Sequence, residues 1–398
     1  MALLHIEDPK RRAPPSFALW ALGFRPFYLL GALFAALALP VWVMVLSGKL
    51  EMPMPGLWWH AHEMLFGFAV AVITGFLYTA GRNWTGLQTP DGKALAALAA
   101  LWLAGRIAMA SSAGALAATV DVLFLPAATF GLARVLVKAK STRNYVMVGI
   151  LSALSLSNLG FHLARLGVIA LDPLPPLHFA LGLIVLLETL MGGRVIPMFT
   201  VNGLRGVRKE PLQPWQPQWL ERAAIGATGL ALLLWVLGGG AWAGVVSLAA
   251  GGLQLARCLG WKPWTTFRVP LVWILHLGHL WIPLGLLLLA ATQWEWLPRA
   301  AALHAFGIGS TGGLIIGMIT RTALGHTGRM LIAGRVETTA YVCVQLAALV
   351  RVGSVVAAPA LVKGAIHLAA TLWATAFLLY FIRYLPWLTR SRPDGKPG

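Results

Sequence analysis

Long apolar segments with almost no charge constrain the fold of this 398-residue chain more than any other feature. Hydrophobic residues make up 58% of the sequence and charged residues only 11%, whereas soluble domains carry roughly 25% charged residues. A transmembrane helix needs roughly 20 consecutive apolar residues. We therefore expect an all-α, polytopic membrane helix bundle, and the composition excludes a soluble enzyme or a disordered regulator.

Twelve segments are long and apolar enough to be transmembrane helices. They are about 20–46, 57–80, 94–111, 115–136, 145–166, 174–198, 220–238, 242–257, 270–292, 299–320, 335–353 and 363–385. The stretch 223–256 is free of charge but too long for one span, and Gly238, Gly239 and Gly240 interrupt it. We divide it into two helices. The longest connecting segment is about 199–219, so residues 1–398 should form a single integral-membrane domain.

Lysine and arginine residues lie mostly in alternate connecting segments. If the N-terminus is cytoplasmic, the predicted outer segments hold only Lys49, Arg165, Arg299, Arg351 and Lys363. Because basic residues favour cytoplasmic loops, this asymmetry predicts that both termini face the cytoplasm, with tails at 1–16 and 388–398. The net charge of +18 then reflects insertion into a bacterial inner membrane and does not indicate a nucleic-acid partner.

Histidines are the most frequent titratable residues within the predicted spans. Six of them fall in the outer third of the membrane: His60, His62, His162, His178, His304 and His367. One interfacial histidine alone has little meaning, but a layer from five helices suggests a cofactor site, because imidazole is the commonest metal ligand and suits iron and copper.

Spacing adds detail to this interpretation. His60 and His62 lie about 200° apart on an ideal helix, so either one precedes the regular helix or they serve two centres. Haem ligated on both faces needs two helices, and His304 matches the depth of His60 or His62. His276 and His279 share one helix face, so they form a second candidate metal pair.

A few other polar residues also call for an explanation. Glu63 follows the His60–His62 pair and could orient a ligand, while Glu188 and Arg194 could form an ion pair or relay protons. Arg106 and Asp121 are expected to form a structural ion pair. Arg321 and His326, expected in a cytoplasmic loop, could bind haem propionates or a quinol headgroup, or could only set the topology. Gly309, Gly313 and Gly317 repeat at the spacing of close helix packing.

Several sequence motifs carry a resemblance to a known family. They are Gly23–Phe27 (GFRPF), Trp59–Phe68 (WHAHEMLFGF), Asn83–Gly86 (NWTG), Gly193–Thr200 (GRVIPMFT), His276–Trp281 (HLGHLW), Leu303–Phe306 (LHAF) and Thr320–Arg329 (TRTALGHTGR). Together the chain resembles the NnrS family over nearly its whole length.

That resemblance implies a twelve-helix inner-membrane protein that binds haem, of b type, and copper and acts in denitrification or nitrosative-stress resistance. Nitric oxide is the implied partner, and a quinol or a cytochrome would supply electrons if the protein reduces it. The resemblance leaves open whether the protein is such an oxidoreductase or a binding factor. A proton- or metal-coupled transporter and an assembly factor are the alternatives. The histidines selected by depth and spacing largely lie within these motifs, but His162, His178 and His367 do not.

Overall fold

The computed structural model describes residues 17–111, 114–205, 207 and 211–394 of the chain. The predicted tail 1–16 lies outside the described residues, as does the end of the C-terminal tail beyond Asp394. Within the described part, the secondary structure is helical apart from one isolated antiparallel bridge between Phe17 and Arg390. Twelve helices are long and apolar enough to cross a membrane, so the predicted fold class and number of spans are confirmed.

The first six spans run from α1 to α7. They are α1 (Phe24–Leu46), a composite of α2 (Gly56–His62), η1 (Glu63–Ala69) and α3 (Val70–Thr85), then α4 (Gly92–Ser111), α5 (Ala115–Lys138), α6 (Tyr145–Arg165) and α7 (Leu174–Gly203). The other six are α8 (Gln218–Val236), α9 (Ala241–Gly260), α10 (Pro270–Gln293), a composite of α11 (Ala300–His304), η4 (Ala305–Gly312) and α12 (Gly313–His326), then α13 (Arg335–Ala357) and α14 (Val362–Thr389). Short 3₁₀ turns, η2 (Thr142–Asn144), η3 (Pro263–Thr265) and η5 (Pro359–Leu361), connect some of these spans.

The glycines at 238–240 separate α8 from α9, as predicted. Their φ angles of 124°, 70° and 93° are positive, and a side chain would disfavour that conformation. Two other predicted boundaries were wrong. Helix α7 continues through Pro197 to Gly203, and Arg321 and His326 belong to helix α12 rather than to a loop.

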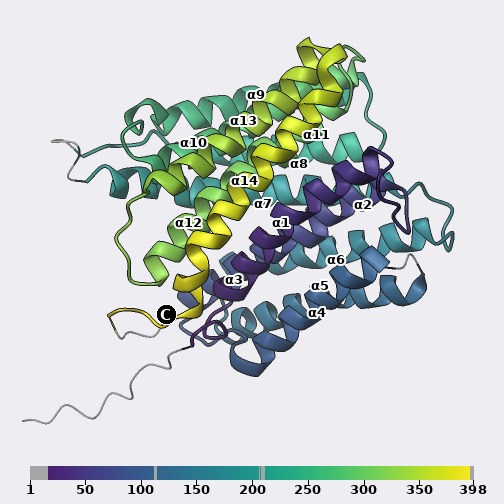
Figure 1. The fold of residues 1–398 in the computed structure, drawn as a ribbon. Helices are drawn as coiled ribbons and strands as arrows, with labels where there is room; N and C mark the ends of the chain where they lie inside the picture. The colour runs from purple at the N-terminus through teal and green to yellow at the C-terminus, as the bar shows by residue number, and fades with distance from the viewer. Residues whose placement is uncertain (1–16, 112–113, 206, 208–210, 395–398) are drawn as a thin grey trace, which may run out of the picture.

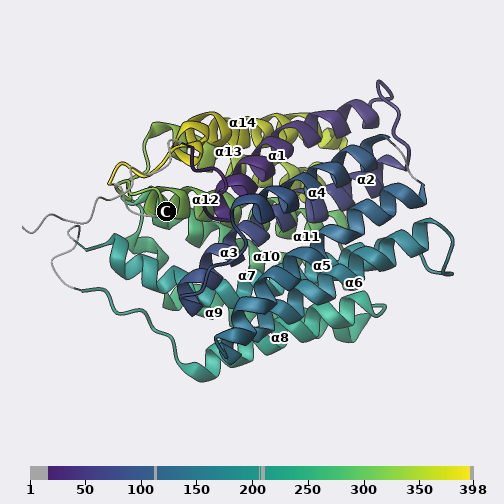
Figure 2. The ribbon, with the colours of Figure 1, turned by 90° about the horizontal axis from the view of Figure 1, so that it is seen from below.

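Helix α7 lies near the centre of the bundle, in contact with α6, α8 and α10 and with both η1 and η4. Helices α1, α13 and α14 lie along one side of the bundle, and α8 and α9 lie on the opposite side (Figures 1 and 2). The two described ends of the chain meet, because Ala18 N–H donates to Thr389 O over 2.8 Å. The end of the bundle where they meet is called the terminal end below, and the opposite end of the bundle is called the far end.

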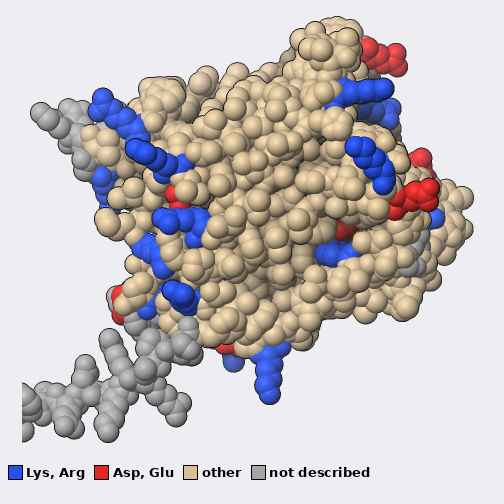
Figure 3. Space-filling model, viewed as in Figure 1, with Lys and Arg blue, Asp and Glu red and all other residues tan. Residues whose placement is uncertain are grey.

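Charged side chains lie toward the two ends of the molecule in the view of Figure 3, and the band between them is mostly uncharged. Such a band is what a protein needs where it faces lipid hydrocarbon, since a charge at the bilayer centre is costly. The distribution agrees with twelve spans that cross one membrane.

Two spans contain a segment of π-helix. η1 begins at Glu63, directly after His62, and η4 begins at Ala305, directly after His304. π-Helix is rare and occurs frequently at functional sites, where an extra residue in one turn re-aims the side chains around it. The two interruptions therefore mark the histidine-bearing turns at the far end.

Helices α10 and α12 touch through their backbones. A Cβ atom added to Gly278 would lie 2.8 Å from the backbone nitrogen of Leu314, and one added to Gly317 would lie 2.8 Å from the Leu275 side chain. The close packing predicted from the glycine repeat is therefore confirmed. It holds the η4–α12 span firmly against the helix that carries His276 and His279.

Candidate functional site

A cavity of about 350 Å³, called the outer cavity below, lies at the far end of the bundle, where six spans converge. His60 of α2 and His304 of α11 both line it. Its walls are mostly apolar, and they include Leu57, Leu177 and Trp373. His178 of α7 also lines the cavity, and its ring packs on Trp235 at 4.9 Å between centroids. The cavity therefore brings together three of the histidines that sequence depth had selected, in surroundings suited to an apolar ligand.

His60 and His304 are held by different contacts. His304 Nδ1 lies 2.7 Å from the backbone oxygen of Ala300. Since a carbonyl only accepts, Nδ1 carries the proton and Nε2 has a free lone pair, which is the tautomer of many histidine ligands. The His60 ring stacks on Trp42 at 4.2 Å between centroids, and its buried Nδ1 has no hydrogen-bond partner.

Two arginines give the same cavity a positive edge. Arg299 is exposed, whereas Arg351 is buried and its Nη1 has no hydrogen-bond partner in the described structure. An unpartnered buried guanidinium is costly unless an anion completes it. Apolar walls, an imidazole with a free Nε2 and free cationic donors together fit a haem with its macrocycle and propionates.

His62 does not belong to this cavity. Its side chain is fully buried, with Nδ1 2.9 Å from Glu63 Oε1 and Nε2 3.0 Å from Asn158 Oδ1. The Nε2 atom also lies 3.2 Å from Asp121 Oδ2. The side chains of His60 and His62 therefore lie in two separate places, as one of the two arrangements that their spacing allowed requires.

The second site is a buried polar network between α2, α4, α5 and α6. Arg106 pairs with both carboxylates: its Nη1 donates to Glu63 over 2.7 Å, and its Nη2 contacts Asp121 Oδ1. The predicted Arg106–Asp121 ion pair is thus present. One carboxylate lies on each side of the guanidinium, and with the contacts of His62 and His162 the network joins four spans.

Three groups of the network converge on one point. His62, Asp121 and His162 each offer a ligand atom, and the three atoms lie within 4.8 Å of one another. His162 Nε2 is 2.8 Å from Asp121 Oδ2, and Arg165 Nε donates to His162 Nδ1 over 2.9 Å. His162 Nε2–H therefore donates a hydrogen bond to Asp121, and a metal ion bound here would take the place of that proton.

The network also constrains His62. Glu63 accepts at its Nδ1, and Asp121 and Asn158 oxygens lie at its Nε2. An imidazole with acceptors on both nitrogens needs either a second proton or a cation on one side. A metal at Nε2, with Nδ1–H donating to Glu63, satisfies both nitrogens and follows the carboxylate–histidine–metal pattern. Two imidazoles and one carboxylate suit a first-row transition metal.

His276 and His279 lie deeper in α10. The Thr200 hydroxyl lies 2.8 Å from His276 Nε2, while neither ring nitrogen of the buried His279 has a hydrogen-bond partner. His279 packs on Trp261 at 4.8 Å between ring centroids. This pair is separate from both sites above, and among the described residues only His62, Asp121 and His162 form a metal-type group of three.

The predicted pairing of Glu188 with Arg194 does not occur. Arg194 donates to Asn144 Oδ1 over 3.0 Å, and Glu188 Oε2 accepts from Ser310 Oγ over 2.5 Å.

The sequence was also compared with known proteins. The NnrS protein family profile matches residues 18–392, nearly the whole chain. The chain belongs to the NnrS family. A search of curated proteins found no match. NnrS membership supports a membrane function related to nitric oxide, in a family associated with haem and metal binding.

Two NnrS-motif residues lie far from the outer cavity. Arg321 places its guanidinium 3.9 Å over the Phe199 ring, and His326 packs near Phe24. At 1.5 Å per residue, His326 is roughly 30 Å along the helix from His304. These residues therefore cannot hold the propionates of a haem bound at His304.

Sequence reasoning selected His162 by depth without a partner, and it missed Asn158 and Arg165, because all three lie outside the NnrS motifs quoted above. Asn158, His162 and Arg165 follow one another at spacings of four and three on α6 and so share one face. A polar stripe in an otherwise apolar span was the available signal. Arg351 was counted only as an outer-segment charge, and its position beside His60 and His304 depends on tertiary packing.

Proposed function

We propose that this protein binds haem in the outer cavity and nitric oxide at the haem. The observation that carries the proposal is the fixed tautomer of His304, whose Nε2 is free in a cavity that it shares with His60. The buried, unpartnered Arg351 is placed to receive a propionate. When bound, haem iron supplies a coordination site for nitric oxide.

The two histidines have unequal roles in this proposal. His304 is the permanent ligand, because its hydrogen bond to Ala300 O orients the ring and raises its basicity. His60 lacks such a partner on Nδ1, so it would be the more weakly held of the two histidines and would leave room for nitric oxide. An apolar cavity at membrane depth gives the uncharged gas access from the bilayer.

We propose copper for the second site, with His62, Asp121 and His162 as ligands. Support comes from the convergence of their three ligand atoms and from the two acceptors that face His62. Arg106 then compensates the remaining carboxylate charge of Glu63. The His276–His279 pair is the weaker candidate, since His276 already uses Nε2 with Thr200.

The haem proposal is tested on the purified full-length protein in detergent. We expect a Soret band and visible bands that shift when nitric oxide gas is added to the reduced protein. A colourless, metal-free preparation from haem-replete cells would instead favour the transporter or assembly-factor alternative and would overturn the proposal.

The copper proposal is tested by metal analysis of His162→Ala. We expect copper bound per protein to fall at least tenfold while haem content stays at the wild-type level, because His162 is absent from the outer cavity. His367→Ala is the matched control, since His367 is exposed on α14. Full copper in His162→Ala would contradict the assignment.

A further inference from the structure

Glu188 is the one acidic residue in the middle of the described spans that lacks a cationic partner. The other carboxylates that form ion pairs within these helices each lie beside an arginine. They are Glu63, Asp121, Glu221 and Glu337. Glu188 forms no such pair in the described structure, and its recorded hydrogen bond is the one from Ser310. An ionisable residue without a countercharge within a membrane span is rare and marks a candidate functional site.

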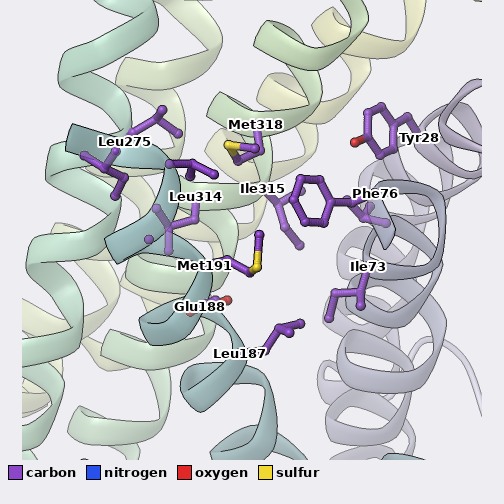
Figure 4. Close-up of a pocket in the computed structure, with 14 residues that line it drawn as sticks. Tyr28, Ile73, Phe76, Leu187, Glu188, Met191, Leu275, Leu314, Ile315 and Met318 are labelled. Atoms are coloured by element: carbon purple, nitrogen blue, oxygen red, sulfur yellow. The ribbon is translucent and has the colours of Figure 1, made fainter. Parts of the chain in front are cut away.

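Its position is between two cavities. Glu188 lines a second, inner cavity, together with Tyr28 of α1, Phe76 of α3, Met191 of α7 and Met318 of α12. Figure 4 shows Glu188 on α7 beside Met191, with Phe76 and Ile73 across the space. The walls of this inner cavity are otherwise apolar, so Glu188 is its only carboxyl group.

The other side of the carboxyl faces the π-helix of the outer cavity. Ser310, its donor, lies in η4, which begins directly after His304. Thr311 is next in the chain and lines the outer cavity itself. Its buried hydroxyl has no hydrogen-bond partner in the described structure. The Glu188–Ser310 hydrogen bond thus connects a residue of the inner cavity to the π-helix that lines the outer cavity.

We propose that Glu188 is a proton-exchange group whose protonation follows the redox state of the outer site. This inference rests on the proposed haem. Reduction of a haem held in the outer cavity by an external one-electron reductant would add one negative charge there. The Glu188 carboxylate would then take up one proton from solvent, and that proton would balance the charge. Ser310, which donates to Glu188 and lies in the π-helix that follows His304, would link the carboxyl group to the outer cavity.

Other titratable or charged groups pack around this part of the bundle. They are Tyr28 of α1, His60 of α2, His178 of α7, Arg257 of α9, His279 of α10, Arg299 and His304 at the start of the α11 span, and Arg351 of α13. None of them forms an ion pair with Glu188 in the described structure. A Glu188 substitution can therefore be separated from their contributions.

The experiment is a redox titration of the haem at several pH values, with dithionite as reductant. In the wild-type protein we expect the midpoint potential to fall as pH rises, by up to about 59 mV per pH unit over a limited window, since a one-electron couple linked to one proton follows that constant. In Glu188→Gln the potential should become independent of pH in that window, with haem content unchanged. Glu221→Gln, at a carboxylate paired with Arg257, is the matched control and should keep the wild-type slope.

Redox-difference infrared spectroscopy supplies a second readout. Reduction of the wild-type protein should produce the C=O stretch of a protonated carboxyl, and this band should be missing in Glu188→Gln. An unchanged slope or a retained band in Glu188→Gln would overturn the inference while the haem proposal stands. A wild-type protein that contains no haem would overturn both.

Discussion

His60 and His62 are two positions apart in α2, yet their side chains belong to different sites on opposite sides of the helix. His60 lines the outer cavity with His304, and His62 joins the buried network with Glu63, Asp121 and Asn158. The network ties the helix to α4, α5 and α6, so it also fixes the direction in which His60 enters the cavity. Two centres can thus be built from one short motif.

Removal of the central arginine should destabilise the network strongly. Arg106→Ala leaves two buried carboxylates, Glu63 and Asp121, without their cation. Loss of one partner from a buried ion pair costs about 3–5 kcal/mol. We expect a clearly lower thermal unfolding midpoint in detergent than for Arg134→Ala, a control at an exposed position of α5. Equal midpoints for the two variants would show that the network does not stabilise the bundle.

A methyl group at Gly278 should disturb the α10–α12 contact. A Cβ there would lie 2.8 Å from Leu314 N and 2.9 Å from Gly313 C, and backbone atoms cannot rotate away. Overpacking of this kind costs about 1–3 kcal/mol. Gly278→Ala should therefore unfold at a lower temperature than wild type. Gly226→Ala, on α8 with open space around it, should be neutral or slightly stabilising.

His326, in the Thr320–Arg329 motif at the terminal end, should not be needed for haem binding. His326 lies at the end of α12, against Phe24 and far from His304. His326→Ala is expected to insert normally and to keep the wild-type Soret spectrum and haem content. A haem loss in His326→Ala comparable to that in His304→Ala would mean that the terminal end holds a haem of its own.

The sidedness of the bundle is a separate prediction from the basic-residue asymmetry. Ser47 follows α1 at the far end, whereas the chain ends close to the start of α1. Reporter fusions at Ser47 and at the C-terminus should report the periplasm and the cytoplasm, respectively. If both reported the same compartment, the twelve-span topology would be wrong.

The sequence alone was sufficient to predict the transmembrane spans, because the length of the apolar segments and the break at Gly238–Gly240 are local signals. It also placed His60, His276 and His304 in candidate sites. It did not separate His62 from His304, since the direction of a side chain on α2 depends on the π-helix that follows it. Nor did it join His162 to Asp121, because that contact requires α5 and α6 to pack at one register.

The most direct test of the account is haem content and spin state in three single variants, measured side by side on the purified protein. His304→Ala should lose most of its haem, because it removes the ligand oriented by Ala300 O. His60→Ala should keep haem but shift it to a five-coordinate, high-spin spectrum. His62→Ala should keep both the haem and the low-spin spectrum, since its side chain faces the network. Full haem in His304→Ala, or equal haem loss in His62→Ala, would contradict the assignment of the outer cavity.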